Sequence, residues 1–157
     1  MSSPVSAQHR ATVAALQDAL ATEHAALWAY GVVSAFVPPE LIDQVNEAAT
    51  AHRARRDATE RMLSDIGVEP IPAEPAYRTP SPVTDLAGTL ALAIIAENDT
   101  ATAWRSLIER SGVVERPAQP RLRSAALDAL VGAAVRASRW RMAARLPVQT
   151  VPFPGAP

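Results

Sequence analysis

Two glutamates, Glu23 and Glu97, stand in the middle of apolar helical patterns. Side chains three and four residues apart share one face of a helix, and both glutamates fall on the face that their apolar neighbours mark as the interior. Burying a carboxylate is costly unless it is paired, hydrogen-bonded or bound to a metal. The two glutamates are therefore the first candidates for chemistry, and their partners must come from other helices.

The two patterns are copies of each other, separated by 74 residues. In both copies the glutamate lies seven residues before an aromatic side chain, Tyr30 or Trp104, which we expect to be an ordinary part of the core. The repeat predicts a pseudo-twofold arrangement of two helical hairpins, each bringing one glutamate to a shared interior. The matched positions are Leu16, Leu20, Glu23, Leu27, Tyr30 and Ser34 in the first copy and Leu90, Ile94, Glu97, Ala101, Trp104 and Ile108 in the second.

A histidine on the interior stripe of a second predicted helix suggests a metal site. His52 with Glu23 and Glu97 would supply two carboxylates and one imidazole, a donor set compatible with iron or manganese. A dinuclear centre normally draws on more ligands than these three. Arginines near the missing positions would also repel a dication, because a guanidinium group is always charged.

The alternative is a polar network in the core without a metal. Arginines would neutralise the two carboxylates, and His52 would bridge them. We favour this network because too few metal ligands are present, so we expect no cofactor and assign no catalytic residue. The predicted members of the network are Glu23, His52, Arg56, Glu97, Arg136 and Arg139.

Prolines and glycines divide the chain into four helices, predicted at about residues 8–36, 40–66, 83–110 and 122–145. Gly67 is placed to end the second helix in a left-handed conformation. Five prolines within 68–82 exclude a helix and favour an extended crossover, which Tyr77 would hold against the bundle. We expect the tail, 147–157, to lie extended on the bundle with Phe153 as its anchor.

These elements predict an all-α protein with a single domain over residues 1–157. Two antiparallel helical hairpins joined by one long proline-rich crossover form the ferritin-like variant of the four-helix bundle. In such proteins each hairpin supplies a Glu from one helix and a Glu-x-x-His from the next. Here His52 is present but Ala49 replaces the glutamate before it, and the fourth helix offers Arg136 and Arg139 instead of ligands. The pattern indicates a degenerate di-metal site.

Several short motifs resemble an actinobacterial ferritin-like family of unknown function. They occur in the order typical of that family and span nearly the entire chain. The resemblance implies a ferritin-like bundle and supplies no activity. The motifs are EHAALWAYG at 23–31, HRARRD at 52–57, PAYRTP at 75–80, AEND at 96–99, RASRW at 136–140 and FPG at 153–155.

Composition sets further bounds. The absence of cysteine excludes a disulfide framework and thiolate metal sites. The first residues lack the apolar core of a signal peptide, and the most apolar run, 86–96, is too short to span a bilayer. We therefore expect a cytoplasmic location and no membrane partner.

The net charge of −1 is unevenly distributed. Between residues 116 and 145 a single acid, Asp128, accompanies seven arginines. Such a basic helix could bind nucleic acid, but we favour the interpretation that it neutralises the acidic helices beside it. The arginines are Arg116, Arg121, Arg123, Arg136, Arg139, Arg141 and Arg145.

The sequence therefore predicts a non-catalytic binding or scaffolding protein that forms a homodimer. The first alternative is a metal-dependent oxidase or hydroxylase that uses Glu23, His52 and Glu97. The second is a nucleic-acid-associated protein that uses the arginine-rich fourth helix.

Overall fold

The computed structural model describes residues 4–111 and 119–157. Within these ranges the chain forms four α-helices and one short 3₁₀ helix and contains no strand, so the predicted all-α helical bundle is confirmed. No helix in the described part combines the length and apolarity needed to cross a membrane. The elements are α1 (Pro4–Ser34), η1 (Pro39–Leu41), α2 (Ile42–Asp65), α3 (Leu86–Arg110) and α4 (Gln119–Ala143).

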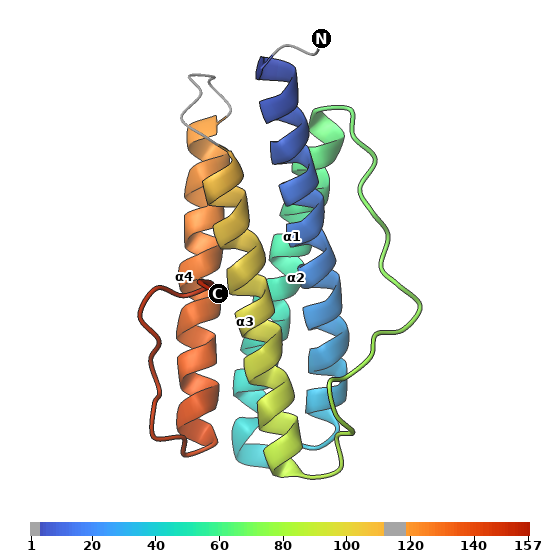
Figure 1. Ribbon diagram of the computed structural model, residues 1–157. Helices are drawn as coiled ribbons and strands as arrows, with labels where there is room; N and C mark the ends of the chain where they lie inside the picture. Colours follow the sequence, from blue (N-terminus) through green and yellow to red (C-terminus); the bar gives the residue numbers. More distant parts are fainter. Residues whose placement is uncertain (1–3, 112–118) are drawn as a thin grey trace.

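The four α-helices lie side by side, with α1 and α4 running one way and α2 and α3 the other (Figure 1). Helix α1 packs against both α2 and α3, and α3 packs against α4. Long side chains join α2 to α4: Arg55 Nη1 donates to the Ala129 carbonyl at 3.2 Å, and Arg139 Nη1 lies 2.9 Å from a Glu47 carboxylate oxygen. All four helices are therefore linked around one interior.

Local sequence explains most of the helix ends. Gly67 has the predicted left-handed backbone, with φ of 73°, and its N–H donates to the Ser64 carbonyl. Helix α3 begins later than predicted because Asp85 is its N-cap, accepting a hydrogen bond of 2.8 Å from the Gly88 N–H. Helix α1 begins earlier than predicted, at Pro4, since a proline is tolerated in the first turn.

The connection between α2 and α3, residues 66–85, runs along the outside of α1 over much of its length (Figure 1). Gln17 exchanges two hydrogen bonds with it, donating to the Glu69 carbonyl and accepting from the Ile71 N–H. His24 Nε2 donates to the Ile71 carbonyl at 3.1 Å. Further along, Tyr77 packs on Trp28 with ring centroids 5.9 Å apart, as predicted for Tyr77. One stripe of α1 therefore holds the connection in place.

The apolar core consists of two clusters. One lies around Tyr30, Val33, Leu90 and Trp140, and the other around Leu16, Leu20, Leu63, Trp104 and Leu107. Along α1 and α3 the residues between these clusters include the two glutamates. The interior is therefore apolar at both ends and polar in the middle.

The C-terminal tail crosses α3, but not through the residue that we predicted. Phe153 is 75% exposed and anchors nothing. Instead Gly155 lies so close to α3 that a Cβ atom there would come within 2.5 Å of the Ala101 carbonyl oxygen, and its φ of 74° favours glycine as well. Contact with the tail therefore depends on a residue without a side chain.

Candidate functional site

The two repeated glutamates meet through one histidine at the centre of the bundle. His52 Nδ1 lies 2.6 Å from Glu23 Oε2, and His52 Nε2 lies 3.1 Å from Glu97 Oε1. All three side chains are completely buried. The structure thus brings together the three residues that the sequence singled out first, with His52 bridging the two carboxylates.

This geometry defines the protonation state of His52. Ionised carboxylates only accept hydrogen bonds, so both ring nitrogens must carry protons to donate to Glu23 and Glu97. Burial lowers the pKa of His52, but the two hydrogen bonds and the charges of Glu97 and Glu23 together outweigh burial and raise that pKa from its ordinary value of 6.5. His52 is therefore an imidazolium held between two carboxylates.

Glu97 carries the denser set of contacts. Its Oε1 atom accepts hydrogen bonds from Tyr30 Oη at 2.5 Å and Arg136 Nε at 2.8 Å, in addition to the one from His52. Burial raises the pKa of Glu97, but the hydrogen bond and charge of His52, together with Arg136, outweigh burial and lower it. Glu97 is therefore stabilised as a carboxylate in a dry interior.

The aromatic side chains of the two repeats bind the glutamates reciprocally. Trp104 Nε1 donates to Glu23 Oε1 at 2.6 Å, whereas Tyr30 donates to Glu97. Helices α1 and α3 are antiparallel (Figure 1). Where Glu23 lies level with Trp104, a step of two turns forward along α1 reaches Tyr30, and a step of two turns back along α3 reaches Glu97 at the same level. The repeated spacing of glutamate and aromatic therefore produces two reciprocal hydrogen bonds between α1 and α3, as the predicted pseudo-twofold requires.

A second indole extends the network. Trp140 Nε1 on α4 donates to Tyr30 Oη at 2.7 Å, and Trp140 is completely buried. Tyr30 thus accepts one hydrogen bond and donates another, to Glu97. Burial and the neighbouring Glu97 charge raise the pKa of Tyr30 well above its ordinary value, so it remains protonated and keeps donating. Tyr30 and Trp104 are core residues, as expected, and Trp140 joins them without having been predicted to. The hydrogen bonds of all three were not predicted.

Arg136 supplies the second cation. Arg136 is only 8% exposed, and its guanidinium pairs with the Glu97 carboxylate. Burial lowers the pKa of Arg136, but the Glu97 charge and hydrogen bond outweigh burial and raise it. Two carboxylates, Glu23 and Glu97, are therefore balanced by one imidazolium and one guanidinium. We call these four residues with Tyr30, Trp104 and Trp140 the core polar network.

Two arginines that the sequence placed in this network lie outside it. Arg56 pairs with its neighbour Asp57 at 2.7 Å, on the partly exposed side of α2. Arg139 pairs with Glu47 at the surface. The buried face of α2 passes through Ala48 rather than the predicted Ala49, which turns Arg56 to its edge. On α4, Arg139 is three residues from Arg136 and falls on the exposed side.

Arg55 takes the inner position that we had assigned to Arg56. Its guanidinium lies over the ring of Trp104, 5.9 Å from the centroid, in a cation–π contact. Burial lowers its pKa, against the opposing charge of Glu23. The HRARRD motif has three arginines, and Arg55 and Arg56 differ by about 100° around the helix, so the choice between them depends on the rotation of α2 in the bundle.

These residues do not fit a metal ion. In the described part of the chain no group of three or more His, Cys, Asp or Glu side chains is arranged to hold one. Both nitrogens of His52 are engaged with carboxylates, so neither has a lone pair for a metal. Arg136 adds a fixed positive charge beside Glu97. The three side chains that the sequence offered as ligands for iron or manganese are present, but they form hydrogen bonds with one another instead.

The complete burial of Glu23, His52 and Glu97 also limits what the network can do chemically. A general acid or base must come within hydrogen-bond reach of a substrate. The arrangement holds protons and charges in fixed places and presents none of these three side chains at the surface.

Residues 15–157 match the family described as Domain of unknown function (DUF4439). The chain belongs to this family. Its structure is similar to the crystal structure of a conserved hypothetical protein, rv2844, from Mycobacterium tuberculosis, with 42% sequence identity and a TM-score of 0.78. The similarity covers 85% of this chain and 97% of that one. No curated protein matches the chain.

The DUF4439 match includes every member of the core polar network. It agrees with the resemblance to a family of unknown function, and the description of the family assigns no activity. Any function must therefore be argued from the geometry of this chain.

The Arg136→Met variant should test the charge balance of the network. Removing the guanidinium leaves Glu97 with less compensation in a buried site, so we expect the free energy of unfolding to fall by about 3 to 5 kcal/mol. The matched variant Arg110→Met breaks only the exposed pair with Asp18 and should cost about 1 kcal/mol or less. Urea denaturation of both variants measures the difference, and equal losses would contradict the assignment of Arg136.

The protonation of His52 predicts a pH dependence with two limbs. The raised pKa of His52 gives stability that is complete below its unfolded value near 6.5 and is lost as pH rises through the folded value. The lowered pKa of Glu97 gives stability that is present above its unfolded value near 4.5 and is lost as pH falls through the folded value. The free energy of unfolding should therefore decline on both sides of a mildly acidic to neutral maximum.

Denaturation of the His52→Gln variant over the same pH range separates the two limbs. This variant should be less stable and should lose the alkaline decline. His9→Gln removes an exposed histidine and should keep the wild-type profile. An alkaline decline that survives in His52→Gln would show that another group causes it.

Proposed function

We propose that this protein is a ferritin-like bundle with a degenerate di-metal site, acting as a non-catalytic binding or scaffolding protein. The observation that carries the proposal is the pairing of Glu97 with both His52 and Arg136. These two cations occupy the interior where a ferritin-like protein would hold its metals. The charge of the metals is then replaced by protein side chains that cannot dissociate.

The arrangement of helices supports the ferritin-like assignment. The connection after α2 runs back along the bundle, so that α3 begins near the end where α1 and α2 are joined (Figure 1). A long crossover of this kind distinguishes ferritin-like bundles from simple up-and-down bundles, and it therefore supports the proposal. The two glutamates on α1 and α3 then correspond to the carboxylates that single helices of such bundles provide.

The runner-up is a metal-dependent oxidase or hydroxylase that uses Glu23, His52 and Glu97. That function requires His52 to release at least one carboxylate and to lose a proton, because a metal binds the neutral imidazole. It also requires a path for the substrate to three completely buried side chains. The geometry therefore favours the binding or scaffolding function.

The Glu97→Gln variant distinguishes the two functions. If Arg136 and His52 replace the metal, the substitution leaves two cations poorly compensated and should destabilise the metal-free protein by about 3 kcal/mol. If the residues are an empty ligand cluster, the substitution relieves repulsion between carboxylates and should be neutral or stabilising. Thermal and urea denaturation of both proteins, with chelator and after incubation with Fe²⁺ or Mn²⁺, gives the comparison.

Glu47→Gln is the matched control, since Glu47 is an exposed glutamate paired with Arg139. It should change stability by about 1 kcal/mol or less in every condition. Elemental analysis of the reloaded wild type should find less than one metal per chain. A wild type that is stabilised by metal and weakened by chelator, beside a Glu97→Gln variant no less stable than the apo protein, would establish the metal-dependent function instead.

We also propose that the protein forms a homodimer through α4. Leu127, Val131 and Val135 recur every fourth residue on this helix and are 46% to 56% exposed. An antiparallel pair of α4 helices with its twofold axis near Ala133 would set Val131 against Val135. The same pairing would bring Asp128 of one copy near Arg139 of the other. This complementary charge favours a second copy of the chain as the partner that covers the apolar stripe.

Sedimentation of the wild type at micromolar concentration should therefore give the mass of a dimer. Val131→Lys places a charge in the centre of the apolar stripe and should yield monomers. Val148→Lys changes a valine in the tail that is at least as exposed as Val131 and should leave the dimer intact. A wild type that sediments only as a monomer would remove this proposal.

The nucleic-acid alternative receives less support from the arginines of α4. Arg136 and Arg139 pair with glutamates, Arg141 with Asn98, and Arg123 with the Ile108 carbonyl. Arg116 lies outside the described residues. Trp140 is completely buried, so it is not available to stack on a base. The arginines of α4 thus act mainly within the bundle, and the cytoplasmic location stays a prediction.

A further inference from the structure

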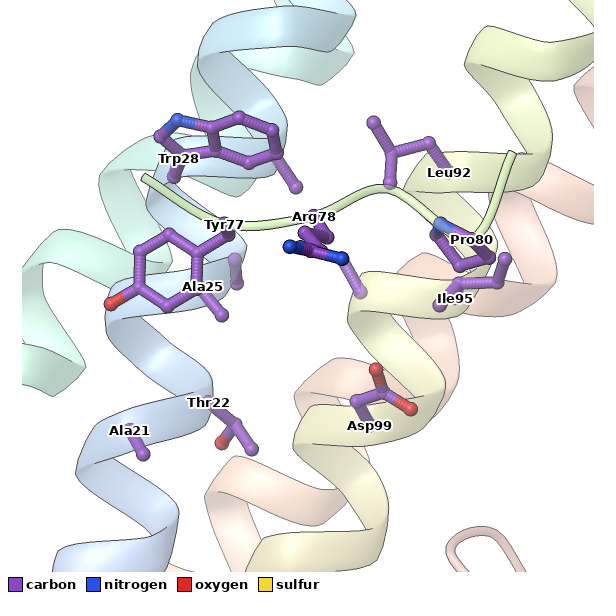
Figure 2. Close-up of a pocket in the computed structure, with 13 residues that line it drawn as sticks. Ala21, Thr22, Ala25, Trp28, Tyr77, Arg78, Pro80, Leu92, Ile95 and Asp99 are labelled. Carbon is purple, nitrogen blue, oxygen red and sulfur yellow. The ribbon is translucent and has the colours of Figure 1, made fainter. Parts of the chain in front are cut away.

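A pocket of about 370 Å³ lies between α1 and α3, beneath the segment of the connection that contains residues 77–80 (Figure 2). Its volume is at the lower end of the range of small-molecule sites, about 300 to 1,000 Å³. None of the residues that line it belongs to the core polar network. It is a second candidate site, on the other side of the α1 and α3 backbones.

Small side chains create this hollow. Ala25, Ala26 and Ala29 on α1 and Ala96 on α3 line it, and they leave space that larger residues would fill. The connection passes over this space, and its Tyr77 packs against Trp28. The result is an apolar pocket with an aromatic pair at one end (Figure 2).

Two opposite charges line the same pocket without pairing with each other. Arg78, on the connection, forms no hydrogen bond or ion pair with any described residue, and its guanidinium lies among the lining side chains (Figure 2). Asp99, on α3, likewise forms no ion pair within the described ranges. Burial raises its pKa, which means that its carboxylate is partly desolvated and lacks a compensating cation.

We propose that this pocket binds a small zwitterion with an apolar side group, of the size and chemistry of a free aromatic amino acid. The ligand carboxylate would pair with the Arg78 guanidinium, and its ammonium group with Asp99. Its apolar group would lie on the alanines beside Trp28. A ligand with only one charge would leave the other side chain of the pocket uncompensated.

The proposal does not rest on the core polar network. Arg78 and Asp99 are exposed, and none of the network hydrogen bonds involves them. Substitutions in the pocket therefore leave the interior intact, and substitutions of Glu97 test the interior alone. The failure of one proposal does not decide the other.

Three probes separate the contribution of each charge. L-phenylalanine carries both charges, N-acetyl-L-phenylalanine lacks the ammonium, and phenethylamine lacks the carboxylate. Calorimetric titration of the full chain should give the tightest binding for L-phenylalanine, by roughly tenfold over either analogue, because each charge-assisted contact contributes about that factor. Protection of Trp28 from solvent gives a second readout by fluorescence quenching.

Variants assign each charge to its partner. Arg78→Met should weaken L-phenylalanine and N-acetyl-L-phenylalanine by roughly tenfold and leave phenethylamine unchanged. Asp99→Asn should weaken L-phenylalanine and phenethylamine and leave the acetylated probe unchanged. Arg53→Met and Asp65→Asn remove exposed charges elsewhere and should alter none of the three affinities.

Thermal melts of each variant check that the fold is retained. Absence of binding by all three probes at millimolar concentration would overturn the proposal. Equal affinities for the three probes would overturn it as well, because they would show that the pocket binds the apolar group and does not discriminate between ligands by charge. Affinities that do not respond to Arg78→Met and Asp99→Asn would place the binding elsewhere.

Discussion

The charge balance around Glu97 is the constraint on which the rest of this bundle depends. A carboxylate in a dry interior is tolerated only with cations and hydrogen bonds beside it, and Glu97 receives both from three other helices. Tyr30 reaches it from α1, His52 from α2 and Arg136 from α4. Slippage of any helix by one residue would remove one of these partners. The network thus favours one register of four helices that are rich in alanine and otherwise easily shifted past one another.

The seven-residue spacing of glutamate and aromatic gains a physical meaning in the antiparallel pair α1 and α3. Within one helix, two turns separate Glu23 from Tyr30, too far for a hydrogen bond. Across the pair, the same two turns bring Glu23 level with Trp104 and Tyr30 level with Glu97. The repeat therefore encodes contacts between its two copies rather than within either. These reciprocal hydrogen bonds join α1 and α3 at two levels along the bundle.

The sequence was sufficient to predict the bundle and the residues at its centre, because a glutamate on an apolar face is a strong signal. It identified Glu23, Glu97 and His52, but it did not distinguish Arg55 from Arg56, or Arg136 from Arg139. Arg55 and Arg56 differ by a rotation of about 100° around their helix, and Arg136 and Arg139 by only about 60° around theirs. An alanine-rich face packs in several rotations, so the pattern alone does not choose between them. The hydrogen bonds of Tyr30 and Trp104 were not predicted, because an aromatic residue at helical spacing is usually explained by the packing of its apolar ring. The hydroxyl and the indole N–H were not considered. The signal was present in the repeated distance from the glutamate.

The same two segments of α1 and α3 serve two sites on different faces. In EHAALWAYG, Glu23 and Tyr30 point to the network, whereas Ala26, Trp28 and Ala29 line the outer pocket. In AEND, Glu97 points inward while Ala96 and Asp99 face the pocket. A network that fixes the register of α1 and α3 therefore also fixes the spacing of the pocket walls. In the interior of this bundle the charges neutralise one another. Arg78 and Asp99, which form no ion pair with any described residue, lie at the outer pocket, where each charge is available to a bound molecule.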